Sequence, residues 1–283
     1  MLKIAHFSDI HFSKITFNPK KLLSKRAIGV LNLILVRKKQ YKENQLFLLH
    51  NLFKNLNINN LIVSGDITST SLEVEFSIAK KFFEKFENIE KHIVPGNHDK
   101  YTKTAHKENR FYKFFEYSED IFSNLLKNDK IEVKILNDKW YYIGLDTCLN
   151  TSLFACSGLF SIEIENKLKN ILEKIPKDKN IILSNHYPVF NNGNKSKILL
   201  RKEVLEEIIK NNKNIKVILH GHTHKRSVEK FSENGYMISS GCVSHKKNGS
   251  FNILEILNDE CKISTYIFLK GNWEKFSEKN INL

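Results

Sequence analysis

The chain has 283 residues, of which 41% are hydrophobic, and 45 Lys and Arg residues outnumber 31 Asp and Glu residues to give a formal net charge of +14. This length and apolar content can bury a sizeable core, so we expect one domain over residues 1–283. Four widely spaced cysteines without a C-x-x-C pair exclude a zinc ribbon and a disulfide framework, and favour a reducing compartment. The basic balance favours phosphate-bearing partners. Only five basic residues are Arg, the residue best suited to specific nucleic-acid contacts, which argues against a nucleic-acid partner.

Short apolar runs that end in polar residues recur along the chain and predict buried strands. They lie at 2–11, 60–66, 91–99, 140–147, 180–188 and 215–224. Between them, apolar residues spaced three and four apart predict helices at 43–56, 71–86, 161–175 and 201–211. The tail from Gly235 to Phe268 has further strand patterns and no helix pattern. Strands that alternate with helices and precede a strand-rich tail predict a layered α/β sandwich with its helices outside.

One segment, at about 14–42, interrupts this alternation directly after the first strand. It holds nine basic residues and no acidic one, and its centre, from Ala27 to Val36, is almost entirely apolar. Ten residues are too few to span a bilayer, which needs about 20. The segment fits a helical insertion that lies on an anionic membrane surface. An ordinary helix packed on the domain edge and a cap that grips acyl chains over the active site remain alternatives.

The first residues, MLKIAHFSDIHF, have neither the long apolar run nor the small-residue cleavage site of a signal peptide. No other run is long enough to cross a membrane. We therefore expect a cytoplasmic protein, with peripheral association at the inner face of the cytoplasmic membrane if the 14–42 segment binds lipid.

The polar ends of the predicted strands carry the groups that suggest chemistry. They are Asp9-x-His11, Gly65-Asp66, Gly96-Asn97-His98-Asp99, His186 and Gly221-His222-x-His224. Strand carboxyl ends converge on one edge of an open α/β sheet, where ligands bind, so these groups should meet in space. Carboxylate, imidazole and carboxamide donors suit a pair of d-block cations. In D-x-H and H-x-H, an extended chain would point both ligands the same way.

Each motif alone also has a purely structural interpretation. Gly65-Asp66 is a common turn after a strand, and Asp99 would serve as a helix N-cap. All the motifs together, each behind its own strand, favour a metal site over separate coincidences.

This arrangement resembles the calcineurin-like metallophosphoesterase superfamily, whose signature is D-x-H, G-D, G-N-H-[DE], a lone His and G-H-x-H, over about residues 3–267. The resemblance implies a four-layer α/β/β/α sandwich of two mixed sheets and a centre of two divalent cations. We expect manganese, with iron, zinc or nickel as alternatives, because these donors discriminate little among metals. One metal would be held by Asp9, His11, Asp66 and His224, and the other by Asp66, Asn97, His186 and His222.

By the same resemblance His98 would lie near the leaving-group oxygen, with Asp99 paired to it and fixing its tautomer. His220 matches no ligand position and is expected to serve in packing or support. Such a centre hydrolyses phosphoesters, because two cations clamp the phosphoryl oxygens and activate a water molecule.

The 14–42 segment resembles the one found at this place in a branch that includes the chlamydial-type UDP-2,3-diacylglucosamine pyrophosphohydrolase of lipid A synthesis, which releases lipid X and UMP. The match rests on a S-K-R-x-x-G-x-x-N-x-x-x-x-R pattern, and implies substrate contacts from Lys25, Arg26, Asn32 and Arg37. The better-known proteobacterial enzyme of this step has Arg in place of His98. The resemblance thus predicts an acylated nucleotide sugar as substrate.

Three other functions remain open. A soluble phosphodiesterase acting on cyclic AMP would use the same core motifs but leaves the apolar-basic segment without a purpose. A DNA nuclease would use the basic surface, against which the scarcity of arginine argues. A protein-binding scaffold with a vestigial site would have lost ligands, and every motif is present here.

Overall fold

The computed structural model describes residues 1–14, 41, 43–115, 119–149, 156–190 and 198–283. Its strands form two six-stranded sheets and a small two-stranded one. The first sheet has the order β14-β13-β12-β1-β2-β3. Its strands are β1 (Leu2–Phe7), β2 (Asn60–Ser64), β3 (Glu90–Val94), β12 (Ser250–Leu257), β13 (Glu260–Leu269) and β14 (Asn272–Asn282). Strands β1, β2 and β3 are parallel, and β12, β13 and β14 continue the sheet antiparallel from β1.

The second large sheet has the order β10-β11-β9-β7-β5-β4. Its strands are β4 (Ile131–Ile135), β5 (Trp140–Leu145), β7 (Asn180–Asn185), β9 (Ile215–His220), β10 (Arg226–Ser232) and β11 (Gly235–Ser240). The four central strands are parallel, whereas β4 and β10 at the two edges run antiparallel to their neighbours. Strands β6 (Gly158–Leu159) and β8 (Leu199–Leu200) form the small parallel pair. Both large sheets are therefore mixed.

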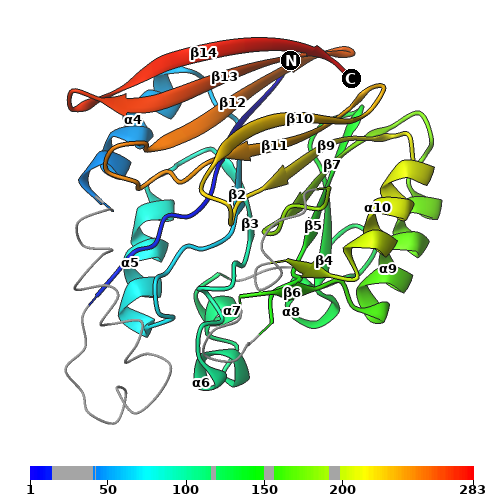
Figure 1. Ribbon diagram of the computed structural model, residues 1–283, viewed down its shortest axis with the longest axis horizontal. Coiled ribbons are helices and arrows are strands. Elements are labelled where there is room, and N and C mark those ends of the chain that lie inside the picture. Colours follow the sequence, from blue (N-terminus) through cyan, green and yellow to red (C-terminus); the bar gives the residue numbers. More distant parts are fainter. Residues whose placement is uncertain (15–40, 42, 116–118, 150–155, 191–197) are drawn as a thin grey trace.

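Helices α4 (Leu49–Asn55) and α5 (Glu73–Glu84) cover the first sheet, and α9 (Ile162–Lys174) and α10 (Lys202–Asn211) cover the second (Figure 1). The short helices α6 (Lys103–Lys107), α7 (Arg110–Phe114) and α8 (Leu126–Asp129) lie together at one end of the sandwich, and the 3-10 helix η2 (Asn44–Leu48) directly precedes α4. Helix α9 shows why such segments are helical, because the Ser161 side chain caps its first turn by accepting from the N–H of Ile164, 3.3 Å away. Its buried residues recur at helical spacing on one face.

Three apolar clusters hold the layers together. One packs α4, α5 and α7 against the first sheet through residues such as Phe53 and Phe82, and a second packs α9 and α10 against the other sheet through residues such as Leu168 and Leu205. The third fills the space between the sheets and includes Trp140 and the fully buried Tyr142. The order of layers is helix, sheet, sheet, helix, which confirms the predicted α/β/β/α sandwich of two mixed sheets.

The predicted helical insertion falls largely at residues 15–40 and 42, outside the described residues. Among the helices that the structure describes, none is long and apolar enough to cross a membrane.

Candidate metal centre

The loops that follow β1 and β2 run side by side and bring three predicted ligands together. The N–H of Asp9 donates to the carbonyl of Gly65 over 3.0 Å, and the N–H of His11 donates to the carbonyl of Asp66 over 3.0 Å. Asp9 and His11 both have left-handed backbones, with φ of 57° and 54°. The D-x-H motif is therefore not extended, and the prediction from strand alternation is wrong, because β1 ends at Phe7 and the chain then turns.

The same backbone conformation recurs at other predicted ligands. Asp66, His222 and His224 have φ of 57°, 67° and 55°. A left-handed non-glycine residue costs about 1–3 kcal/mol and persists only where the surrounding structure enforces it. Such residues are enriched at functional sites in proteins, and five of the fourteen in the described part of this chain are predicted ligands.

Two glycines let the loops after β2 and β3 approach each other. Gly65 has a φ of +90°, and a Cβ atom there would lie 2.7 Å from Nδ1 of His186. A Cβ atom on Gly96 would lie 2.2 Å from both the backbone N and the carboxylate Oδ1 of Asp66. A side chain at either position would therefore displace a predicted ligand.

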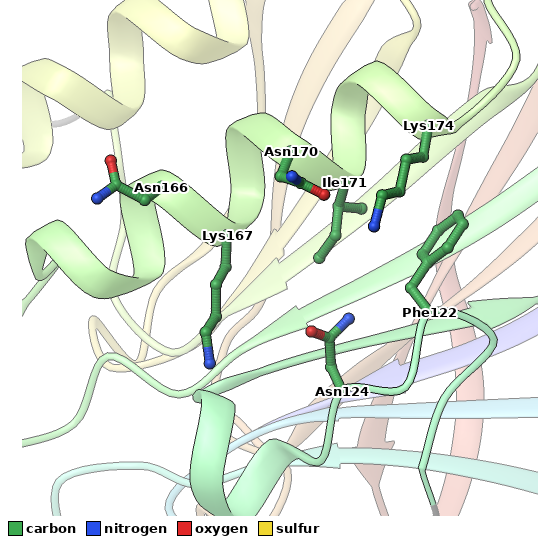
Figure 2. Close-up of a pocket in the computed structure, with 7 residues that line it drawn as sticks. All are labelled: Phe122, Asn124, Asn166, Lys167, Asn170, Ile171 and Lys174. Atoms are coloured by element: carbon green, nitrogen blue, oxygen red, sulfur yellow. The ribbon is translucent and has the colours of Figure 1, made fainter.

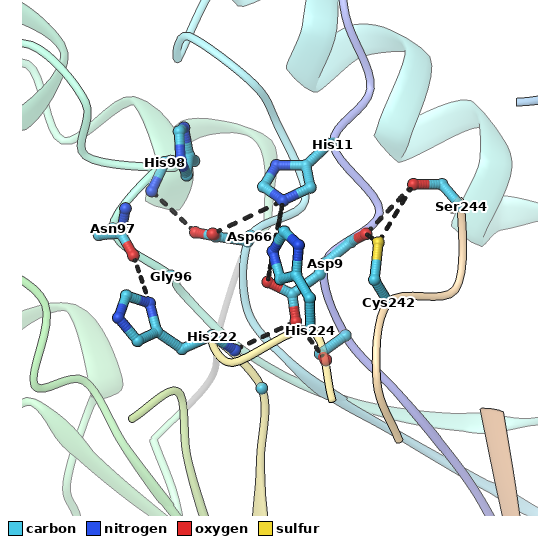
Figure 3. A network of polar contacts seen from close by, with 12 residues as sticks. Asp9, His11, Asp66, Gly96, Asn97, His98, His222, His224, Cys242 and Ser244 are labelled. Carbon is cyan, nitrogen blue, oxygen red and sulfur yellow. Dashed lines mark hydrogen bonds and ion pairs between the residues drawn. The ribbon is translucent and has the colours of Figure 1, made fainter. Parts of the chain in front are cut away.

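The two carboxylate oxygens of Asp9 have different partners (Figure 3). Its Oδ2 accepts from Ser8 Oγ at 2.6 Å and from the N–H of His222 at 3.1 Å. Its Oδ1 instead faces two imidazoles, with Nε2 of His224 at 3.0 Å and Nε2 of His11 at 3.8 Å. The two Nε2 atoms lie 3.3 Å apart.

Asp66 is arranged in the same way. Its Oδ1 accepts from the N–H of His98 at 2.8 Å, which leaves Oδ2 facing Nε2 of His11 at 3.9 Å and Nε2 of His186 at 3.5 Å. Asp66 thus stands between two groups of donors, one containing His11 and the other containing His186.

The second group is completed by a carboxamide. Oδ1 of Asn97 lies 3.2 Å from Nε2 of His186 and 3.0 Å from Nδ1 of His222. Nδ1 of His186 is 2.7 Å from the carbonyl of Ser64, which can only accept, so Nδ1 carries a proton whether the ring is neutral or charged. A cation that displaces the proton from Nε2 would therefore bind the ring through that atom.

The donor set fits divalent cations. Oδ1 of Asp9 is fully buried and pairs with Nε2 of His224 at 3.0 Å. A buried carboxylate oxygen needs a positive partner, which is either a protonated imidazole or a cation bound in the place of that proton. Oxygen and imidazole nitrogen are the donors that Mn, Fe, Zn and Ni accept in proteins.

The site is also strongly polarised. Burial alone would raise the pKa of Asp9, but the charges of His224 and then His186 outweigh it and bring that pKa to about 2. The neighbouring imidazoles, His186 foremost, hold the pKa of Asp66 well below its usual range despite burial. Burial opposes the charged form of His186, yet Asp66 raises its pKa to about 9. The buried carboxylates are thus anionic and attract positive charge to this point.

His98 lies at the rim of this cluster, but its partner differs from the predicted one. Its Nδ1 lies 2.8 Å from the carbonyl of Ser69, and its ring stacks on Tyr101 with centroids 5.3 Å apart. The Asp99 carboxylate accepts instead from Thr68 and from two further backbone N–H groups of the loops after β2 and β3. The predicted pairing of Asp99 with His98 is therefore wrong, because those backbone donors draw the carboxylate into the turn.

The structure brings together all the residues predicted as metal ligands, together with His98. These are Asp9, His11, Asp66, Asn97, His98, His186, His222 and His224. His220, the last residue of β9, is buried. Lys25, Arg26, Asn32 and Arg37 lie outside the described residues. Ser8 and Ser69 also contribute to the site and were not predicted from the sequence. Ser8 acts through its hydroxyl group and Ser69 through its backbone carbonyl, and neither group distinguishes these residues from others in the chain.

A separate pocket lies against helix α9 (Figure 2). It has a volume of about 200 Å³ and is lined by Phe122, Asn124, Asn166, Lys167, Asn170, Ile171 and Lys174. Its lining contains no carboxylate or imidazole, and Nζ of Lys174 lies 5.7 Å from the Phe122 ring centre. It therefore lacks the carboxylate and imidazole donors that the candidate metal centre brings together.

Comparison with known proteins agrees with this site. The profile of the calcineurin-like phosphoesterase family matches residues 2–226. No curated protein sequence matches the chain. Among solved structures, a dimetal phosphatase from Danio rerio aligns with 99% of this chain and 98% of its own, at 11% identity and a TM-score of 0.72.

Two further solved structures share the fold. A purple acid phosphatase from yellow lupin (Lupinus luteus) seeds aligns with 99% of this chain and 53% of its own, at 9% identity and a TM-score of 0.64. TT1561 of Thermus thermophilus aligns with 89% of this chain and 93% of its own, at 14% identity and a TM-score of 0.53. With the family profile spanning most of its length, the chain belongs to the calcineurin-like phosphoesterase family and is a metal-dependent phosphoester hydrolase.

Proposed function

We propose that the chain hydrolyses a pyrophosphate-linked substrate at a centre of two divalent cations that share Asp66. The observation that carries this proposal is the position of Oδ2 of Asp66, which faces His11 on one side and His186 on the other. Asp9, His11 and His224 would complete one cation site, and Asn97, His186 and His222 the other. When bound, such a pair clamps phosphoryl oxygens and lowers the pKa of water; we propose manganese for this role.

His98 is the residue that would exchange a proton with the leaving-group oxygen. Because the Ser69 carbonyl can only accept, Nδ1 of His98 holds its proton in the neutral ring and in the imidazolium alike. Nε2 is therefore the atom at which a proton is gained or lost. Stacking on Tyr101 keeps the ring from turning away. Asp99 supports the turn that carries His98 and would not take part in proton transfer.

For the substrate we propose an acylated nucleotide sugar of the UDP-2,3-diacylglucosamine type, which water would split at the P–O–P bond into UMP and an acylated sugar phosphate, lipid X. The apolar and basic 14–42 segment supports this, since it offers apolar surface for acyl chains and cations for phosphates. Lys25, Arg26, Asn32 and Arg37 are the proposed contacts. The chain would act in lipid A biosynthesis, as a peripheral protein on an anionic membrane surface.

The ends of that segment support the same substrate. The N–H of Ser13 donates to Oε1 of Glu43 over 3.2 Å, so the chain leaves and returns at one place. Ser13 is two residues from His11. A substrate held by its phosphates at the candidate metal centre therefore lies beside both ends of the segment.

The experiment compares UDP-2,3-diacylglucosamine, cyclic AMP and bis-p-nitrophenyl phosphate as substrates with added manganese. We expect the acylated nucleotide sugar to be preferred, and the preference to vanish when residues 20–39 are replaced by a short polar loop. Turnover of bis-p-nitrophenyl phosphate should survive that replacement and serves as the control. Rapid turnover of cyclic AMP that ignores the replacement would overturn the substrate proposal in favour of a cyclic-nucleotide phosphodiesterase.

A further inference from the structure

Tyr41 contacts two imidazoles of the candidate metal centre. Its hydroxyl lies 3.4 Å from Nδ1 of His224, and its ring lies against His11 and His224 with centroids 5.1 and 6.3 Å away. Both histidines belong to the cation site that contains Asp9. One aromatic residue thus touches the two rings that face the same carboxylate oxygen.

The backbone of Tyr41 is held in place from the other side. It forms an isolated antiparallel bridge with His245, and their rings meet edge to face with centroids 6.1 Å apart. Nδ1 of His245 accepts from the N–H groups of Lys247 and Asn248 at 3.3 and 3.1 Å. Tyr41 is therefore anchored to the loop after β11, independently of its contacts with His11 and His224.

His224 is the imidazole that most needs such support. Its side chain is 32% exposed, whereas those of His11 and His186 are fully buried. Its Nε2 faces Oδ1 of Asp9, so a ring that binds a cation through Nε2 carries its proton on Nδ1. The phenolic oxygen of Tyr41 is placed to accept that proton in a hydrogen bond.

We propose that Tyr41 is a positioning residue, which orients His224 and so raises the affinity of one cation site of the pair. This inference rests on the proposed two-cation function and adds a residue that the family signature motifs do not contain. Removing the outer hydrogen-bond partner of a metal-binding histidine typically weakens metal affinity 10- to 100-fold. A long hydrogen bond that a phenolic oxygen accepts belongs at the lower end of that range.

The test is a titration of the metal-free protein with cobalt. Calorimetry measures the affinity of each binding event, and visible absorption reports the environment of each bound ion. Tyr41→Phe keeps the ring contacts with His11 and removes only the hydroxyl. Tyr266→Phe is the matched control, because Tyr266 stacks on Phe251 in the first sheet, with centroids 5.0 Å apart, and is not among the metal-centre residues. We expect Tyr41→Phe to weaken one of the two binding events about tenfold and to alter the absorption of that ion alone, with an unchanged thermal midpoint.

Cobalt affinities and spectra identical to those of the wild-type chain would overturn the inference and leave the two-cation proposal standing. Equal weakening of both events together with a lower thermal midpoint would also overturn it, since that pattern indicates lost packing. A wild-type chain that binds no cation pair would overturn the proposed function and this inference together.

Discussion

The buried carboxyl group of Glu132 should make the stability of the fold depend on pH. It lies on β4, is 3% exposed, and its Oε1 has no hydrogen-bond partner among the described residues. Burial raises the pKa of Glu132 from its ordinary 4.5 to about 8, with Lys134 opposing and Asp120 assisting the rise. At about 1.4 kcal/mol for each pH unit, this gap corresponds to up to about 5 kcal/mol.

The sign follows from which form the fold prefers. The folded pKa lies above the unfolded one, so the stabilising effect of neutral Glu132 is complete below pH 4.5 and is lost as the pH rises to about 8. Glu132→Gln keeps the side chain neutral throughout. We expect it to match the wild-type chain near pH 4.5 and to exceed its free energy of unfolding by several kcal/mol at pH 9.

Urea denaturation followed by circular dichroism between pH 4.5 and pH 9 measures this difference. Glu274→Gln, at an exposed position of β14, is the control and should leave the pH profile unchanged. Wild-type and Glu132→Gln curves that stay parallel over the whole range would refute the assigned burial of this carboxyl group.

Three further substitutions, the last with a matched control, separate chemistry from structure. His98→Ala should retain both cations and lower kcat about 10²- to 10⁴-fold, measured on bis-p-nitrophenyl phosphate; a loss of metal would contradict the proton-transfer role. Asp99→Asn should lower the free energy of unfolding by about 1–3 kcal/mol, because it places an amide against backbone donors, while kcat per folded molecule stays within a few-fold. Gly96→Ala should abolish metal binding in a dialysis assay, because the new Cβ atom would overlap Asp66. Gly271→Ala is the control: Gly271 has a φ of +92° and no atom near the added Cβ, so this variant should lose only about 1 kcal/mol to backbone strain and keep the metals.

One physical property of parallel strands made it possible to predict from the sequence both the sandwich fold and the proximity of the metal donors. Parallel strands bury both faces, so β2, β7 and β9 appear as short apolar runs, and each polar residue directly after such a run lies at the carboxyl edge of its own sheet. The two sheets pack with those edges side by side, as the contact between His186 and the carbonyl of Ser64 shows. The spacing of Asp66, His186 and His222 in the chain is irrelevant to that argument, which is why it succeeds over long separations.

Other features left no periodic signal. Strand β14 is an edge strand exposed along most of its length, so its sequence NWEKFSEKNIN shows no apolar face. Helices α6 and α7 have five residues each, too few to display helical periodicity, and α7 depends on the burial of Phe111 and Tyr112.

The finer site geometry was also beyond the sequence. The left-handed conformations of Asp9 and His11 arise because their N–H groups bond to the neighbouring loop, a contact between distant segments. The partner of His98 is a backbone carbonyl, and every residue has one. Tyr41 lies more than 180 residues from His224 along the chain, and nothing in its local sequence indicates that the two side chains are in contact.

Metal content is the most direct test of the shared carboxylate at Asp66. The wild-type chain and Asp66→Ala are dialysed against manganese, freed of excess ions and measured for metal per chain, with Asp99→Asn as the buried-carboxylate control. We predict two manganese ions for the wild-type chain and the control, and none for Asp66→Ala. A variant that keeps one ion or both would contradict a centre in which Asp66 joins the two cations.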